Sequence, residues 1–250
     1  MRGLFTAGVL DIMMDHSFRP DTICATSAGA TFGINLPSGQ RGRVLRYNLE
    51  LAGDPRYFSL RSLLTTGNVV NSDFAYRILP DELDPFDYKA FAESGTDFFA
   101  CVTNTRTGQP EYMKVTDVKK QIDCIRASAS LTFLSRKVVI DGERYLDGGI
   151  ADNTPLDKCI SEGCERTVVV LTRPKGFVMN EDMYFLSRLM YPREKALQNA
   201  FRQRSRRYNE RLSQIERLEA EGSIFVIRPS EPIALSRLEK DHSKIQAAYD

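Results

Sequence analysis

The stretch from Ile23 to Ala30 places one serine, Ser27, between a short apolar run and a run of very small residues. The apolar residues predict a strand, and the small residues predict a helix that lies close to its neighbours. A serine at the crest of a sharp strand-to-helix turn has its hydroxyl pushed out of the backbone. The N–H groups that open the helix then point at whatever the hydroxyl attacks. Ser27 is therefore a candidate nucleophile.

The usual form of this turn is G-x-S-x-G, and Ala25 stands where the first glycine would be. A serine before a helix can equally be a plain N-cap, whose side chain accepts a hydrogen bond from the first turn. Taken by itself, the stretch leaves both interpretations open.

Composition excludes several classes of protein. The 250 residues are 42% apolar and 27% charged, which fits one large or two modest globular domains. With a net charge of only +1, the protein as a whole is not attracted electrostatically to nucleic acid or to an anionic surface. The five cysteines show no C-x-x-C spacing, which disfavours a disulfide framework and a zinc site and favours a reducing compartment. The sequence has no bilayer-spanning apolar run and no leader, so we expect a cytoplasmic protein.

The hairpin at residues 138–146 is the clearest local signal. Two runs rich in β-formers flank Asp141-Gly142, the two-residue turn that most strongly favours a hairpin. The hairpin leads into Asp147-Gly148-Gly149, where two residues without side chains let the backbone approach another loop. Asp147 is the best-placed carboxylate to act as a base. The alternative interpretation is that Asp147-Gly148 forms a turn with no functional role.

Strands and helices alternate along the first 172 residues, which indicates an α/β architecture. Predicted strands cover residues 22–25, 97–103, 111–115 and 167–172, the last being an apolar run of the kind buried on both faces of a parallel sheet. Predicted helices cover residues 4–16, 118–129 and 155–162. Residues 43–90 predict short helices and loops, and we expect them to cover the substrate.

The chain after residue 172 is mainly helical and highly charged. We divide the protein into a catalytic domain, residues 1–172, and a helical region packed on it, residues 173–250, with helices over 183–220 and 236–249 and a strand over 223–227. Five arginines of the first helix fit either contact with anionic lipid headgroups or a solvated helix face beside Glu210 and Glu216. They are Arg202, Arg204, Arg206, Arg207 and Arg211.

An activated serine needs a base within hydrogen-bond reach. The chain has only two histidines, His16 at the end of the first predicted helix and His242 in the charged C-terminal helix. Neither has the loop placement typical of a catalytic base. The remaining option is a carboxylate that acts directly on the hydroxyl, which makes Ser27 and Asp147 a dyad.

Three blocks of sequence together resemble the patatin-like phospholipases, in particular a bacterial branch. They are Arg2–Leu10, Thr26–Ala30 and Asp147–Gly149 with Asn153-Thr154-Pro155 after it, and their order and spacing agree. The runs Ala127–Ser130 and Ile227–Ser230 also resemble that branch, so the resemblance spans nearly the whole chain. The resemblance implies a three-layer α/β/α fold with a mainly parallel central sheet and a helical C-terminal extension. It also implies a lipid acyl hydrolase that cleaves carboxylic esters through an acyl-enzyme, with Ser27 as nucleophile and Asp147 as base.

In that family a glycine-rich loop ending in R-G or K-G supplies the N–H groups of the oxyanion hole. Here Arg2 and Gly3 represent the end of that loop, with the N–H of Ala28 as a further donor, and Gly29 completes the serine motif as Gly148 and Gly149 complete the aspartate motif. Each missing donor costs about a hundredfold to a thousandfold in rate. We therefore expect weak or no activity of the chain as written unless residues precede Met1.

The start of the chain differs from the usual order of strands and helices in a parallel sheet. Consecutive parallel strands need a crossover connection, yet no strand precedes the helix predicted over residues 4–16. The sequence is therefore expected to be truncated at its N-terminus or to form a sheet that is one strand short.

The expected partners are a lipid or acyl-ester substrate and the membrane surface, with no nucleic acid and no metal or organic cofactor. One alternative is a Ser-His-Asp α/β-hydrolase, because Ser27, Asp147 and His242 occur in that chain order. That fold needs several strands before its nucleophile, and only 26 residues precede Ser27. The other alternative is a scaffold that keeps the fold without catalysis.

Overall fold

The central sheet is organised around one strand, β2 (Asp97–Asn104). The computed structural model describes residues 1–57, 67–68, 70–236 and 239–250. Every side chain from Phe98 to Asn104 is buried. This is the pattern of a strand that is covered by helices on both faces.

Strands and helices follow one another in the order expected of an α/β fold. The other strands are β1 (Thr22–Thr26), β3 (Pro110–Val115), β4 (Val138–Ile140), β5 (Glu143–Asp147), β6 (Thr167–Val170) and β7 (Ile224–Ile227). The helices are α1 (Gly3–Asp15), α2 (Ala28–Gly33), α3 (Arg43–Glu50), the π-helix η1 (Phe74–Leu83), α5 (Tyr88–Glu93), α6 (Ile122–Ser128), the 3₁₀ turn η2 (Gly148–Ile150), α7 (Leu156–Ser161), α8 (Tyr184–Met190), α9 (Lys195–Ala220) and α10 (His242–Tyr249).

Two strands share one edge of β2. The strand β3 pairs with β2 along almost its full length and so occupies one edge. Because a strand has only two hydrogen-bonding edges, β1 and β5 must divide the other edge between them. Thr26, the last residue of β1, pairs with Cys101, and Asp147, the last residue of β5, pairs with Val102. The C-terminal ends of β1 and β5 therefore meet beside two consecutive residues of β2.

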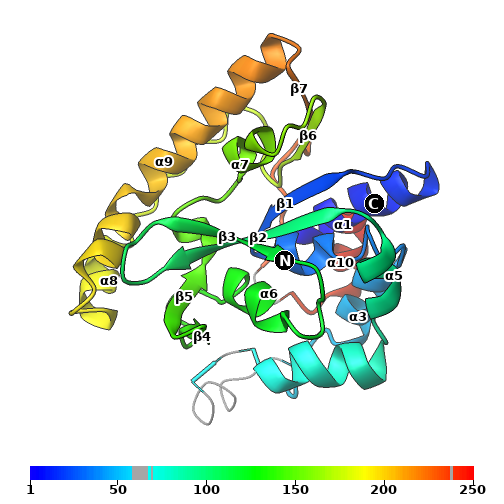
Figure 1. The fold of residues 1–250 in the computed structure, drawn as a ribbon, viewed down its shortest axis with the longest axis horizontal. Coiled ribbons are helices and arrows are strands. Elements are labelled where there is room, and N and C mark those ends of the chain that lie inside the picture. Colours follow the sequence, from blue (N-terminus) through cyan, green and yellow to red (C-terminus); the bar gives the residue numbers. More distant parts are fainter. Residues whose placement is uncertain (58–66, 69, 237–238) are drawn as a thin grey trace.

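Helices cover both faces of this sheet and give the molecule three layers (Figure 1). On one face, Phe98 and Ala100 share a buried core with Ala30 of α2 and Ile125 of α6. On the other face, Leu146 packs against α9, and α7 lies against β1. The α/β class and the three layers are as the sequence predicts.

The first and last helices pack against each other. Leu4 and Ala7 of α1 share a core with Ile245 of α10 and Tyr47 of α3. The contact is so close that a Cβ atom at Gly8 would lie 1.9 Å from the carbonyl oxygen of Tyr249. The C-terminal helix is thus part of the same packed layer as the N-terminal helix.

The expectation of a mainly parallel sheet is wrong. In the five-stranded sheet β1 and β2 pair in parallel, whereas β2–β3, β2–β5 and β4–β5 are antiparallel. Short turns join β2 to β3 and β4 to β5, and such turns can connect only antiparallel neighbours, since parallel neighbours need a long crossover. The connection from β2 to β5 is long, so the antiparallel pairing of these two strands does not follow from its length. The sheet is mixed, and β6 and β7 form a separate parallel pair.

The hairpin prediction is confirmed in detail. Asp141 and Gly142 both have positive φ angles, 49° and 84°, as the mirror-image turn of a two-residue hairpin requires.

Two other predictions need correction. The strand β6 is buried on one side only, because α9 covers Val169 while Val168 and Val170 stay half-buried. The helix predicted over residues 183–220 is interrupted between α8 and α9 at Pro192, which has no N–H to continue the first helix.

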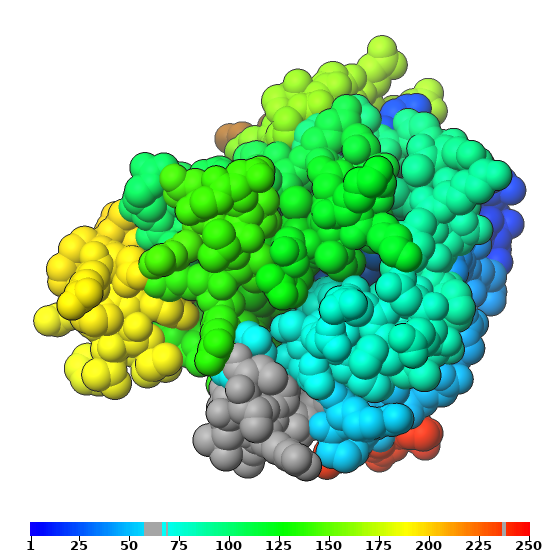
Figure 2. Space-filling model, turned by 60° about the horizontal axis from the view of Figure 1, so that its bottom comes forward, coloured from blue at the N-terminus to red at the C-terminus, as the bar shows by residue number. Residues whose placement is uncertain are grey.

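The helix α8 lies at the outer edge of the molecule, beside the β4–β5 hairpin (Figures 1 and 2). None of the helices in the described residues is both long enough and apolar enough to span a bilayer. Of the segment 43–90, which we expect to cover the substrate, residues 58–66 and 69 lie outside the described part of the chain.

The close contact at Gly8 makes a specific stability prediction. Replacing Gly8 by alanine should lower the melting temperature by several degrees, because the new methyl group meets a backbone carbonyl that no side-chain rotation can move away and overpacking costs about 1–3 kcal/mol. Gly29→Ala is the matched control, since its Cβ would have 3.9 Å of clearance and alanine favours a helix. Thermal unfolding followed by circular dichroism compares the two. Equal melting temperatures would contradict the packing of α1 on α10.

Candidate active site

Ser27 sits in a strained turn between β1 and α2. Its φ and ψ angles are 57° and −123°, in a region that non-glycine residues seldom adopt and that recurs at functional sites. Although Ser27 occupies the N-cap position of α2, its side chain makes no capping hydrogen bond. Its hydroxyl instead donates to Oδ2 of Asp147 at 2.8 Å. The simple N-cap interpretation of this serine is therefore wrong.

The carboxylate of Asp147 is held in a fixed orientation. Its Oδ1 atom accepts a hydrogen bond from the backbone N–H of Gly149 at 2.7 Å, which leaves Oδ2 facing Ser27. The backbone carbonyl of Asp147 accepts a second bond, from the hydroxyl of Thr103 on β2, at 2.8 Å. The side chain and the main chain of Asp147 are thus both anchored.

Gly148 allows this loop to lie against β2. A Cβ atom at position 148 would lie 2.3 Å from the carbonyl oxygen of Cys101 and 2.7 Å from its carbonyl carbon. Only glycine fits so close to a backbone. The close approach that the Asp-Gly-Gly sequence predicts is present, and it turns the chain sharply at the end of β5.

The backbone of the serine turn is held by two further side chains. The N–H of Ser27 donates to Oγ of Ser128 at 3.0 Å, and Ser128 is fully buried at the end of α6. The hydroxyl of Thr26 donates to the carbonyl of Asp152 at 3.1 Å. Residues 127–130 are all small, but nothing in the sequence shows that Ser128 binds the backbone of Ser27.

The expected oxyanion residues come together next to Ser27. The helices α1 and α2 begin side by side, so that a Cβ atom at Gly3 would lie 2.8 Å from the Cβ of Ala28. Both residues open a helix, where backbone N–H groups have no partner within the helix. Among the described residues, neither N–H donates a recorded hydrogen bond. Arg2 precedes this pair as the N-cap of α1.

The two histidines lie elsewhere. His16 caps the far end of α1, and His242 opens α10, and both are exposed. No contact of either histidine with Ser27 or Asp147 is recorded in the part of the chain that the structure describes. His242 lines a shallow hollow with Leu49 of α3. The geometry does not favour a Ser-His-Asp triad.

Two of the five clustered arginines point inward, contrary to both interpretations of that cluster. Arg204 donates through Nε to the carbonyl of Gly149 at 3.0 Å. Arg211 forms an ion pair with Asp157 at 2.8 Å and lies 3.8 Å from Asp152. The hydrogen bond from Arg211 lowers the pKa of the Asp157 carboxyl. The helix α9 therefore holds the loop that follows Asp147.

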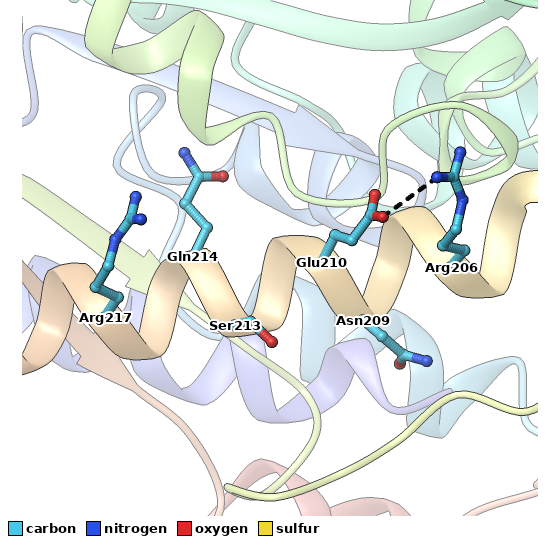
Figure 3. A pocket seen from close by; sticks show the side chains of 6 residues that line it. All are labelled: Arg206, Asn209, Glu210, Ser213, Gln214 and Arg217. Atoms are coloured by element: carbon cyan, nitrogen blue, oxygen red, sulfur yellow. Dashed lines mark ion pairs between the residues drawn. The ribbon is translucent and has the colours of Figure 1, made fainter.

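The outer face of α9 matches the interpretation of a solvated face. Arg206 pairs with Glu210 at 3.5 Å one turn along the helix. These residues line an open hollow of about 790 Å³ together with Asn209, Ser213, Gln214 and Arg217 (Figure 3). All six side chains come from a single helix, and neither Ser27 nor Asp147 is among them, so this hollow is not the candidate active site.

Two residues near the dyad carry no sequence signal. Tyr76 of η1 lies against the core that holds α2, and burial raises the pKa of its phenol, with smaller contributions that include the Asp147 carboxylate. Arg126 of α6 acts on the same phenol in the opposite direction. Only the tertiary structure brings η1 and α6 together beside Asp147.

The sequence is also similar to known protein families and to a curated protein. A sequence model described as patatin-like phospholipase matches residues 1–160, and a model of a domain of unknown function, DUF6363, matches residues 194–250. The uncharacterized protein YjjU of Escherichia coli strain K12 is 32% identical over 182 residues, which cover 69% of this chain and 49% of YjjU. The chain thus spans about half the length of that curated relative. Since the first model covers more than half of the residues, the chain belongs to the patatin-like phospholipase family.

Proposed function

We propose that this chain is a lipid acyl hydrolase of the phospholipase A or esterase type, which cleaves carboxylic esters through Ser27 and Asp147. Membership of the family supports the hydrolysis of lipid acyl esters in general. The observation that carries the proposed dyad is the 2.8 Å hydrogen bond from the Ser27 hydroxyl to Oδ2 of Asp147 at a strained turn. The residues 1–172 are proposed as the catalytic domain.

The reaction follows from the direction of that hydrogen bond. As Oγ of Ser27 attacks the ester carbonyl, Asp147 takes its proton, and a tetrahedral intermediate forms. The carbon–oxygen bond to the alcohol then breaks, Asp147 returns the proton to the departing alcohol, and an acyl-serine remains. A water molecule attacks this ester in the same way, and the fatty acid leaves as Ser27 regains its proton.

The negative charge of the intermediate needs hydrogen-bond donors. We propose the N–H groups of Gly3 and Ala28, which lie together at the beginnings of α1 and α2. Donors fixed before the reaction stabilise the oxyanion without reorganisation. The tight contact between Gly3 and Ala28 supports this role, because a larger residue at either position would push the two helix ends apart.

A hydrolase that takes its substrate from a lipid bilayer must contact the surface of that bilayer. We therefore propose peripheral contact with a membrane as part of this function.

Removing either member of the proposed dyad should abolish hydrolysis. Ser27→Ala should leave no hydrolysis of a short-chain acyl ester such as p-nitrophenyl butyrate above background, because no nucleophile remains. Asp147→Asn should lower kcat by about a hundredfold to ten-thousandfold, because general-base catalysis contributes on that order. His242→Ala is the matched control and should leave the rate unchanged. A near-normal rate for Asp147→Asn contradicts the dyad, and a large loss in His242→Ala favours the triad instead.

A fluorophosphonate probe tests the nucleophile directly. The unaltered protein should be labelled at Ser27, identified by mass spectrometry of the labelled peptide, and Ser27→Ala should not. Absence of labelling in a protein that is folded by circular dichroism would favour a scaffold without catalysis.

Ser128 should act as a positioning residue. Ser128→Ala removes the acceptor of the Ser27 N–H, and leaving a buried donor unpaired costs about 1–3 kcal/mol. We expect kcat for the short-chain ester to fall about tenfold with KM nearly unchanged. Ser130→Ala is the matched control, since that buried hydroxyl bonds only to the carbonyl of Ala127 in the described structure. Equal kcat values for the two variants would contradict the positioning role.

A further inference from the structure

The helix α8 turns an apolar face to the solvent. Four large apolar side chains on this seven-residue helix are exposed: Phe185 at 78%, Leu186 at 42%, Leu189 at 70% and Met190 at 48%. Residues four positions apart lie on the same face of a helix, so these two pairs form one continuous patch. On the opposite face, Ser187 is fully buried. Single exposed apolar residues are ordinary, but a continuous patch marks an interaction surface.

Unpaired cations border this patch. Arg188, Arg193, Lys195 and Arg202 are exposed, and no ion pair is recorded for any of them among the described residues. Arg188 of α8 and Arg202 of α9 lie 5.9 Å and 5.6 Å from the ring centroid of Tyr184 on α8.

The nearby carboxylates do not neutralise these cations. Glu181 pairs with Arg204, and Glu194 pairs with Lys137. The third carboxylate of residues 181–195, that of Asp182, accepts a hydrogen bond from the N–H of Tyr184. The surface around α8 is therefore positive, although the whole chain carries a net charge of only +1.

Stacked aromatic residues support the apolar patch of α8 from beneath. Tyr191, directly after α8, stacks on Phe133 with ring centroids 5.8 Å apart, and Phe133 stacks on Phe201 of α9 at 5.1 Å. Tyr191 and Phe201 are buried. The aromatic cluster thus fixes the C-terminal end of α8 to α9.

The helix also begins close to the proposed active site. Met183, the N-cap of α8, receives a hydrogen bond on its sulfur from Nη1 of Arg204 at 3.3 Å. The Nε of the same arginine binds the carbonyl of Gly149, and the N–H of Gly149 binds Asp147. One arginine side chain therefore separates the start of α8 from the loop that holds the proposed base.

We propose that α8 docks this protein onto the surface of an anionic phospholipid bilayer. The four apolar side chains enter the boundary between headgroups and acyl chains, and the surrounding arginines and lysine contact the phosphates, as in other interfacial helices. A second copy of the chain fits less well, because a symmetric contact would bring the same cations face to face. This inference rests on the proposed lipid hydrolysis and names the surface that the lipid substrate is drawn from.

Sedimentation with vesicles tests the docking. The unaltered protein should sediment with phosphatidylcholine vesicles that contain 30% phosphatidylglycerol, and at least tenfold less with phosphatidylcholine alone or in high salt. The double variant Phe185→Ser/Leu189→Ser should lose at least tenfold in partitioning. Phe225→Ser, a comparably exposed residue on β7, is the matched control and should bind normally. Equal binding by all three proteins would overturn the proposal.

A charge variant covers the case in which the double variant fails to fold. Arg188→Glu/Arg193→Glu should weaken binding to the anionic vesicles and leave the circular dichroism spectrum unchanged. Retention of full binding by this variant contradicts the docking. A shift from dimer to monomer in the double variant, with no vesicle binding by the unaltered protein, assigns the patch to a second copy and also overturns the proposal.

Activity measurements separate this inference from the proposed function. The double variant should hydrolyse the soluble ester p-nitrophenyl butyrate at the unaltered rate, since α8 does not touch the dyad, and should lose at least tenfold on vesicle phospholipid. Vesicle binding without any hydrolysis supports the docking and contradicts the proposed catalysis. Hydrolysis of the soluble ester without vesicle binding supports the proposed catalysis and contradicts the docking.

Discussion

The shared edge of β2 is the constraint on which the candidate site depends. Because β3 occupies one edge, β1 and β5 must use the other edge one after the other, and they run in opposite directions. Their C-terminal ends therefore converge beside Cys101 and Val102. Ser27, which directly follows one strand, and the carboxylate of Asp147 at the end of the other then meet at hydrogen-bond distance without any long loop.

This convergence brings two backbones unusually close together, and the residues there are small for that reason. Gly148 is the extreme case, since any side chain would overlap the carbonyl of Cys101. The strained φ of Ser27 is a second consequence, because the chain must leave β1 before it meets the end of β5. Ser128 and Thr26 hold this strained turn by hydrogen bonds to its backbone and to the neighbouring loop. Strain of this kind persists only where the surroundings fix the backbone.

The C-terminal region contributes to the site although it lies outside the part of the chain that the patatin-like model matches. The long helix α9 binds the loop after Asp147 through Arg204 and Arg211. The same helix supports α8 and its apolar face through stacked aromatic rings. One element thus connects the loop of the proposed base to the surface that we assign to lipid.

The sequence by itself determined what is local. The Asp-Gly hairpin, the strand-to-helix turn at Ser27 and the glycines after Asp147 were predictable, because each depends on the backbone preferences of two or three adjacent residues. The tertiary structure alone decided what depends on residues far apart in the chain. The mixed sheet, the hydrogen bond from Ser27 to Ser128 and the inward direction of Arg204 and Arg211 follow from which strands share an edge and which helix covers them. No periodicity of the sequence encodes those pairings, since they are fixed only when the whole core packs.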